Sequence, residues 1–79
     1  MDNDYFEDFH FKIKTYTKRE LACLYLPETT PRCAMRTFIR WIRKNKTLLK
    51  SLQALGWNAR TRTFTPREVS LIVETLDEP

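Results

Sequence analysis

The residues of this sequence that could take part in chemistry are basic, and they gather in its middle. Between Thr29 and Arg67 there are ten Lys and Arg residues and no Asp or Glu. A solvated surface usually mixes both signs of charge, because mixed charges form ion pairs and favour solubility. A stretch of purely positive charge instead favours an anionic partner. The ten residues are Arg32, Arg36, Arg40, Arg43, Lys44, Lys46, Lys50, Arg60, Arg62 and Arg67.

Catalytic or metal-binding chemistry has little support among the residue types present. A structural zinc site needs about four ligands, whereas the chain has only His10, Cys23 and Cys33 besides its carboxylates. A single glycine excludes a glycine-rich phosphate loop. We therefore expect no enzyme activity, no catalytic residue, no metal and no cofactor.

The acidic residues lie mostly at the two ends of the chain. Residues 1–8 carry four acids and residues 75–79 carry two, with no base in either segment, so the net charge of +4 hides a strong segregation. We expect residues 1–8 to fray, because a polar terminus has little to pack against. The acidic N-terminus differs from a secretion signal, and no apolar run approaches the ~20 residues of a membrane span. A cytoplasmic protein with free thiols and no membrane contact is the expectation.

The helix predicted most strongly runs from Pro31 to about Asn45. Thr30 is suited to cap it, and proline fits the first helical position, where its missing amide hydrogen is no loss. At about 100° per residue, five basic residues fall within an arc of about 120°, and apolar residues fill the other side. The basic arc holds Arg32, Arg36, Arg40, Arg43 and Lys44, and the apolar arc holds Ala34, Met35, Phe38, Ile39, Trp41 and Ile42.

A strand is predicted near the start of the chain. Apolar and polar residues alternate from Phe9 to Tyr16, which is the period of a half-buried strand. The inner face of this strand would carry Phe9, Phe11, Ile13 and Thr15.

A shorter helix is predicted directly after the strand. Thr17 and Glu20 have the spacing of a capping box, in which each side chain bonds to the other residue's backbone amide. The helix would span Lys18 to Tyr25 and end before Pro27, with Leu21, Leu24 and Tyr25 facing inward.

Three further elements are predicted after the basic helix. Asn45 would end that helix and cap another over Thr47–Leu55, which Gly56 stops in a left-handed conformation. The segment Trp57–Phe64 ends in alternating Arg and Thr residues and predicts a second strand, antiparallel to the first. A second capping box, Thr65 to Glu68, opens the last helix. The apolar stripes of the two helices are Leu48, Leu49, Leu52 and Leu55, and Val69, Ile72, Val73 and Leu76.

Together these elements predict a single domain over residues 9–79. It would be mainly α-helical with a small two-stranded antiparallel β-ribbon, in the order β-α-α-α-β-α. The first two helices would form a helix-turn-helix-like unit, with the ribbon as a short wing.

In such a domain the basic residues would have distinct roles in binding duplex DNA. Arginines near the start of the recognition helix could read bases, because a guanidinium group binds guanine O6 and N7 together. The predicted base readers are Arg32 and Arg36; the phosphate contacts are Arg40, Arg43, Lys44, Lys46 and Lys50; and the wing contacts are Arg60 and Arg62.

Other interpretations remain open. The basic face could be an ordinary solvated surface, or it could dock an acidic protein partner. It could also bind RNA or single strands, with Trp41 or Trp57 stacking on bases. Arg60 and Arg62 could serve only to protect a strand edge. A homodimer is a further option, since small modules usually bind specific sites in pairs.

Several motifs resemble a family of small, uncharacterised bacterial proteins that form a domain of unknown function. The motifs are FKIKTYTKRELA at residues 11–22, LYLP at 24–27, RWI at 40–42, LQALGW at 52–57 and RTFTPREV at 62–69. The resemblance covers about Phe11 to Pro79. It implies no particular activity.

A broader resemblance is to winged helix-turn-helix proteins of the MerR or excisionase type. The Thr-x-x-Glu-Leu-Ala opening of that group is matched from Thr17 to Ala22. The resemblance implies DNA binding in transcriptional or mobile-element regulation, with Arg36, Arg40 and Arg43 on the recognition helix. The sequence departs from this group in its long turn, Leu26–Thr30, and in the additional helix over Thr47–Leu55.

Overall fold

The structure is a computed structural model that describes residues 11–79. The predictions for residues 1–8, Phe9 and His10 lie outside this range. Within it, the mainly helical class, the two-stranded antiparallel sheet and the order β-α-α-α-β-α are confirmed. The elements are β1 (Tyr16–Thr17), α2 (Lys18–Tyr25), α3 (Pro31–Lys44), α4 (Lys46–Ala54), β2 (Thr63–Phe64) and α5 (Pro66–Leu76).

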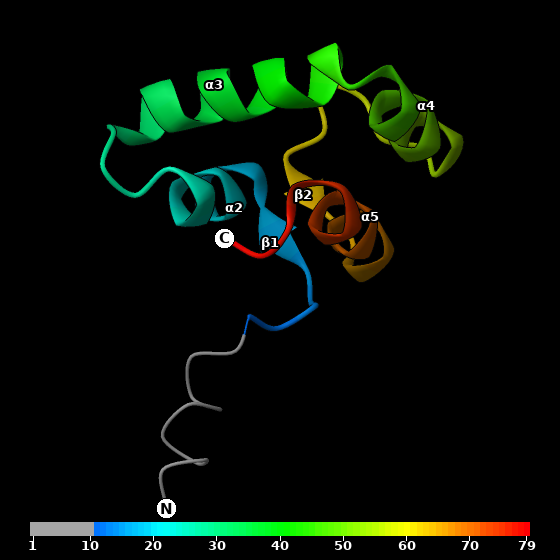
Figure 1. The fold of residues 1–79 in the computed structure, drawn as a ribbon, viewed down its shortest axis with the longest axis horizontal. Helices are drawn as coiled ribbons and strands as arrows, with labels where there is room; N and C mark the ends of the chain where they lie inside the picture. The colour runs from blue at the N-terminus through cyan, green and yellow to red at the C-terminus, as the bar shows by residue number, and fades with distance from the viewer. Residues whose placement is uncertain (1–10) are drawn as a thin grey trace, which may run out of the picture.

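The long helix α3 forms one side of the molecule (Figure 1). Helices α2 and α5 and the small sheet lie on its inner side, and α4 follows at its C-terminal end. Nothing in the described part of the chain covers the outer side of α3 in this view. The helix can therefore present a full face to solvent.

Threonine caps begin three of the four described helices, as the sequence predicts. Thr17 starts α2 with a complete capping box, in which its hydroxyl accepts from the Glu20 amide at 3.0 Å and its amide donates to the Glu20 carboxylate at 2.9 Å. Thr65 and Glu68 repeat this arrangement at α5. Thr30 caps α3 by accepting from the Cys33 amide. Each cap satisfies backbone amides that have no partner inside the helix.

Asn45 joins α3 to α4 without an intervening loop. Its amide donates to the Trp41 carbonyl at 3.2 Å and ends α3. Its side-chain oxygen accepts from the Leu48 amide at 3.0 Å and begins α4. This double role confirms the prediction, although α4 begins and ends one residue earlier than expected. Gly56 follows with φ of 98°, in the left-handed region predicted for it.

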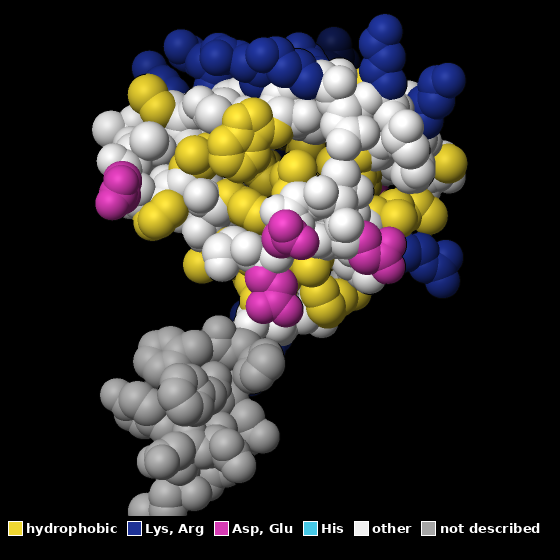
Figure 2. Space-filling view, in the orientation of Figure 1, with side chains coloured by type: hydrophobic (Ala, Val, Ile, Leu, Met, Phe, Trp, Pro, Cys, Tyr) yellow, Lys and Arg dark blue, Asp and Glu magenta, His cyan; other side chains and the backbone are white. Residues whose placement is uncertain are grey.

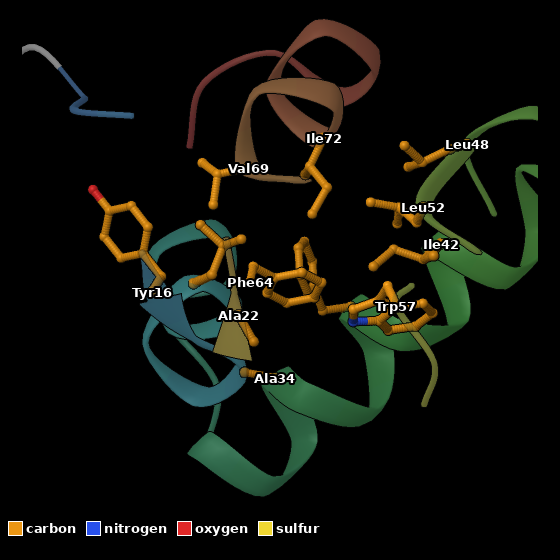
Figure 3. Packing of buried hydrophobic residues seen from close by; sticks show 12 residues of the cluster. Tyr16, Ala22, Ala34, Ile42, Leu48, Leu52, Trp57, Phe64, Val69 and Ile72 are labelled. Atoms are coloured by element: carbon orange, nitrogen blue, oxygen red, sulfur yellow. The ribbon is translucent and has the colours of Figure 1, made fainter. Parts of the chain in front are cut away.

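One hydrophobic core joins all four described helices to the sheet (Figure 3). Phe38 of α3 lies within it. The centroid of its ring is 5.2 Å from that of Tyr25 and 6.0 Å from that of Phe64. Trp57 stacks on Phe64 at 5.8 Å. Each large apolar side chain buried here contributes about 1.5–3 kcal/mol. The core holds Tyr16, Leu21, Ala22, Ala34, Phe38, Ile42, Leu48, Leu52, Trp57, Phe64, Val69 and Ile72.

The prediction of a strand over Phe9–Tyr16 is wrong for residues 11–15. Only Tyr16 and Thr17 pair with β2, and Tyr16 faces the core at 8% exposure, whereas Ile13 is 47% exposed. The Tyr16 hydroxyl donates to the Lys12 carbonyl at 2.8 Å, a contact that an extended strand would not allow because four residues span about 13 Å. The segment therefore bends back on itself, and alternation without a partner strand did not produce a sheet.

The second predicted strand is also shorter than expected. Of the segment Trp57–Phe64, only Thr63 and Phe64 are in β2. The Asn58 side chain accepts from the Arg60 amide at 2.8 Å, and the Asn58 carbonyl accepts from the Thr61 amide at 3.0 Å. Asparagine favours such turns because its side chain imitates a backbone acceptor. This turn replaces most of the expected strand.

Two leucines predicted to be inward are exposed. Leu24 is 45% exposed because the inner face of α2 is centred between Leu21, Ala22 and Tyr25, about 110° from Leu24 around the axis. Leu55 is 38% exposed because α4 ends at Ala54, so the residue no longer continues the stripe.

Candidate nucleic-acid interface

The outer face of α3 carries the basic residues that the helical projection placed there. Ala34, Phe38 and Ile42 are fully buried, and the opposite side of the helix is exposed. Figure 2 shows Lys and Arg side chains in a band along α3. The exposed basic residues of this helix are Arg32, Arg36, Arg40, Arg43 and Lys44.

Four of these residues form a single row along the helix. Arg32, Arg36, Arg40 and Lys44 follow one another at intervals of four residues, so each lies one turn above the last. The first turn of α3 has no acidic residue, and the whole helix has none. Like charges at this spacing repel by about 0.2–0.5 kcal/mol per pair in isolated helices. The row is therefore a surface that an anion would stabilise.

Helix α4 continues the basic surface beyond Asn45. Lys46 and Lys50 are exposed and one turn apart, while Leu48 and Leu52 are buried on the inner side. Because Asn45 joins the two helices directly, these lysines have a fixed position relative to α3.

A groove runs along one flank of α3, and we call it the α3 groove. It has a volume of about 650 Å³ and lies between α3 and the residues around Lys18 and Ala59. Met35 and Ile39 are its apolar, half-buried part, and no acidic residue lines it. Its lining consists of Lys18, Met35, Arg36, Ile39, Arg40, Arg43, Lys44 and Ala59.

Arg62 lines a second depression that adjoins the α3 groove. A smaller depression of about 380 Å³ is lined by Arg62 and shares Lys18 and Met35 with the groove. The sheet explains this position, because the Lys18 amide donates to the Arg62 carbonyl at 2.7 Å next to the β1–β2 pairing. Of the two predicted wing residues, Arg62 is thus beside α3. Arg60 is exposed in the turn before β2 and lines neither depression.

Two basic residues at the start of α2 were missed by the sequence analysis. Lys18 lines both depressions, and its ammonium group donates to the Ala59 carbonyl at 2.8 Å. Arg19 lines the smaller one. In the sequence both stand inside the capping box, which explains them without a ligand. The register of Thr17 with Thr63 would have placed them opposite Arg62, but alternation alone does not give register.

The two tryptophans differ in their access to a ligand. Trp57 is 3% exposed and stacks on Phe64, so its predicted alternative role in stacking on bases does not fit the structure. Trp41 is 36% exposed at the margin of the apolar side of α3. Of the two, only Trp41 can contact a partner without unfolding.

The titratable groups of residues 11–79 include two thiols and a capping carboxylate. This part of the chain holds no group of three or more His, Cys, Asp or Glu residues arranged to bind a metal. Cys23 and Cys33 are free thiols. The pKa of Glu20 lies below its ordinary value, chiefly because the carboxylate accepts the Thr17 amide hydrogen. Its role is that of a helix cap. None of the helices described for residues 11–79 has the length and apolarity needed to cross a membrane.

The fold and its charged surface define a small helical domain with a one-sided basic face. Residues 12–79 match the family Domain of unknown function (DUF4248), and the chain belongs to this family. The resemblance noted in the motifs is thereby confirmed for the family. Searches of curated proteins and of solved structures found no match. The resemblance to MerR or excisionase proteins is untested by these comparisons and stays a prediction.

Proposed function

We propose that the protein is a non-enzymatic domain that binds duplex DNA through the exposed side of α3. The observation that carries the proposal is the row of Arg32, Arg36, Arg40 and Lys44 on a helix that has no acidic residue. Phosphate groups are the anions that such a row fits best, because they repeat along a polymer and arginine binds them with two parallel hydrogen bonds.

The shape of the surface supports duplex DNA as the ligand. Helix α3 has 14 residues, about 21 Å in length, and its outer side is uncovered in Figure 1. A helix of this kind fits the major groove, which is about 12 Å wide. Arg32 and Arg36 would then lie near bases at the N-terminal end. Arg40, Arg43 and Lys44, with Lys46 and Lys50 of α4, would contact phosphates.

The α3 groove adds a second contact region to the proposed DNA interface. With the helix in the major groove, one sugar–phosphate strand would lie along the groove between α3 and Arg62. Lys18 and Arg19 would add contacts from the start of α2. The biological setting we propose is transcriptional or mobile-element regulation in the cytoplasm, as the MerR-like opening of α2 suggests.

Salt-dependent DNA binding tests the proposal. Fluorescence anisotropy with a labelled short duplex gives the dissociation constant at several salt concentrations. If about five residues neutralise phosphates, the affinity should fall with a log–log slope of about −4 to −5. The double substitution Arg36→Gln, Arg40→Gln should weaken binding by roughly tenfold or more and make the slope shallower by about two.

Arg67→Gln is the matched control for this experiment. Arg67 is exposed on α5, and it lines neither depression beside α3. Its substitution removes one positive charge of the same kind and should change the affinity little. A flat salt response, or an equal loss on substituting Arg67, would refute binding through α3. A single strand that displaces the duplex would favour the RNA or single-strand interpretation.

A second candidate function is docking of an acidic protein segment. Met35 and Ile39 make part of the α3 groove apolar, and an amphipathic acidic helix could bury its apolar side there. This alternative predicts that an acidic amphipathic peptide binds and that Arg36→Gln, Arg40→Gln abolishes the binding. It also predicts negligible affinity for DNA at physiological salt.

A further inference from the structure

A second exposed surface lies on the other flank of α3, and we call it the Trp41 face. Its centre is a depression of about 620 Å³ lined by Trp41, Lys44, Asn45, Lys46, Thr47 and Leu76. Trp41 is 36% exposed, and Leu76 is half-buried. The face thus combines exposed apolar surface with the lysines at the junction of α3 and α4.

Aromatic contacts extend the apolar part of the Trp41 face toward the C-terminus. Trp41 packs edge-on against Phe38, with 6.4 Å between the ring centroids, and Phe38 stacks on Tyr25 with 5.2 Å between theirs. The Tyr25 hydroxyl donates to the Asp77 carbonyl, which ties the end of α5 to α2. Trp41 and Tyr25 therefore pack on the same buried ring, and Tyr25 is bonded to the residue that follows Leu76.

The opposite edge of the Trp41 face is acidic. The carboxylates of Asp77 and Glu78 lie close enough to Tyr25 to help burial raise the pKa of its hydroxyl to about 12. Lys44 and Lys46 form the other edge. Figure 2 shows the same order on one face of the molecule, with apolar side chains between a band of Lys and Arg and a group of Asp and Glu.

We propose that the Trp41 face binds a second copy of this chain in a two-fold symmetric dimer. In such a dimer the same patch from both copies meets itself. A two-fold axis that lies in the interface, parallel to the two edges, exchanges them, so Lys46 of each copy faces Glu78 of the other. Apolar centres would cover each other, and each attraction would occur twice.

The dimer leaves the N-terminal part of the basic row on α3 free. Arg32 and Arg36 lie about 140–180° from Trp41 around the helix axis. A second copy therefore leaves Arg32 and Arg36 open to a nucleic acid, whereas Lys44 and Lys46 lie at an edge that the two ligands would share. The proposal does not depend on the proposed function, because association is measured on the protein alone.

Charge reversal at the two edges tests the dimer. Lys46→Glu cancels the positive charge of the Lys44–Lys46 edge, and Glu78→Lys cancels the negative charge of the Asp77–Glu78 edge. Both residues are exposed, so neither change disturbs the core. In sedimentation equilibrium at low salt, each variant alone should dimerise roughly tenfold more weakly than the unaltered chain. An equimolar mixture of the two should restore a dimer, because the intact acidic edge of one variant then meets the intact basic edge of the other, and the two altered positions again carry opposite charges.

Matched controls separate this contact from general charge and hydrophobicity. Lys50→Glu changes the net charge equally at a position outside the Trp41 face and should leave the dimer intact. Trp41→Ala should weaken the dimer, whereas Leu55→Ala, at a residue exposed to a similar 38%, should not. Circular dichroism confirms that each variant is folded.

The outcomes that overturn the proposal are distinct. The dimer is refuted if the unaltered chain stays monomeric at high concentration and low salt. It is also refuted if a mixture of Lys46→Glu and Glu78→Lys gives no more dimer than either variant alone. Growth of the mass beyond a dimer would indicate a head-to-tail contact instead.

Discussion

At the scale of single residues, Arg60 and Arg62 lie two positions apart in the sequence but differ in whether they lie beside α3. Both belong to the same Arg-Thr-Arg segment, and the sequence analysis assigned both to a wing. Arg62 lies where the sheet begins and lines a depression with Met35 of α3. Arg60 belongs to the Asn58 turn and lines neither depression. Only Arg62 is placed to cooperate with α3.

This difference gives a prediction about DNA affinity. Arg62→Gln should weaken duplex binding about three- to tenfold and reduce the salt slope by about one, because one phosphate contact is lost. Arg60→Gln should have a clearly smaller effect, and it serves as the control for charge. The measurement is anisotropy titration of both variants at several salt concentrations. Equal losses would mean that the position of Arg62 beside Met35 has no part in binding.

The basic residues of α3 could be placed from the sequence, but their neighbours could not. Arg32, Arg36 and Arg40 follow from helical period, which depends only on residues close in the chain. Lys18 reaches the α3 groove, and Arg19 the smaller depression beside it, through the pairing of β1 with β2, across more than forty residues. Such long-range register is not encoded in any local pattern.

At the scale of elements, the caps are the feature that the sequence predicted best. Thr17, Thr30, Asn45 and Thr65 each begin a helix as expected. A cap is decided by a few neighbouring residues whose side chains compete for free backbone amides. The lengths of the two strands were predicted wrongly for the opposite reason. An alternating segment forms a sheet only where a distant partner strand is present.

The capping box of α2 predicts a dependence of stability on pH. The amide of Thr17 lowers the pKa of Glu20 below its ordinary value of 4.5 in the folded chain. A lowered folded-state pKa means that the carboxylate stabilises the fold above pH 4.5 and that this stabilisation is lost as pH falls through the folded-state pKa. The free energy of unfolding of Glu20→Ala should therefore be lower than that of the unaltered chain at neutral pH and converge with it in acid.

Urea denaturation at neutral and acidic pH measures this convergence. Glu74→Ala, which removes an exposed glutamate that is not a helix cap, is the control and should give a smaller, unrelated difference. A difference for Glu20→Ala that persists unchanged in acid would show that the carboxylate charge has no part in the cap.

At the scale of the whole molecule, charge is divided between two sides. In Figure 2 the Lys and Arg band follows α3, and the acidic side chains visible in that view lie away from it. No acid interrupts the sequence from Thr29 to Arg67. The acidic side chains lie farther from the basic row on α3 than the members of the row lie from one another, so the attraction between acids and row is weaker than the repulsion within the row. The row therefore dominates the local electrostatic energy of the free protein.

Thermal stability should reveal this repulsion. The triple substitution Arg32→Gln, Arg36→Gln, Arg40→Gln should stabilise the free protein at low salt by about 1 kcal/mol, because like-charge contacts between turns disappear. For a domain of this size that is a rise in Tm of about 4–8 °C. Sodium chloride should raise the Tm of the unaltered chain and narrow the gap to the variant.

The control is the single substitution Arg67→Gln, which removes a positive charge outside the row. It should leave the salt dependence of Tm almost unchanged. A triple variant that melts below the unaltered chain at low salt would contradict the prediction, and it would assign these arginines a structural role in the free domain.

The joint at Asn45 has a consequence for how the molecule opens. Asn45 accepts a hydrogen bond from the Leu48 amide and donates one to the Trp41 carbonyl. The end of α3 and the start of α4 therefore depend on the same residue. Fraying on either side releases both. Amide hydrogens around Asn45 and Leu48 should therefore exchange with solvent in one cooperative event, and the last turn of α3 has no independent way to loosen. The basic residues of α3 and α4 therefore keep a fixed spacing and a fixed angle between the two helices until that event occurs.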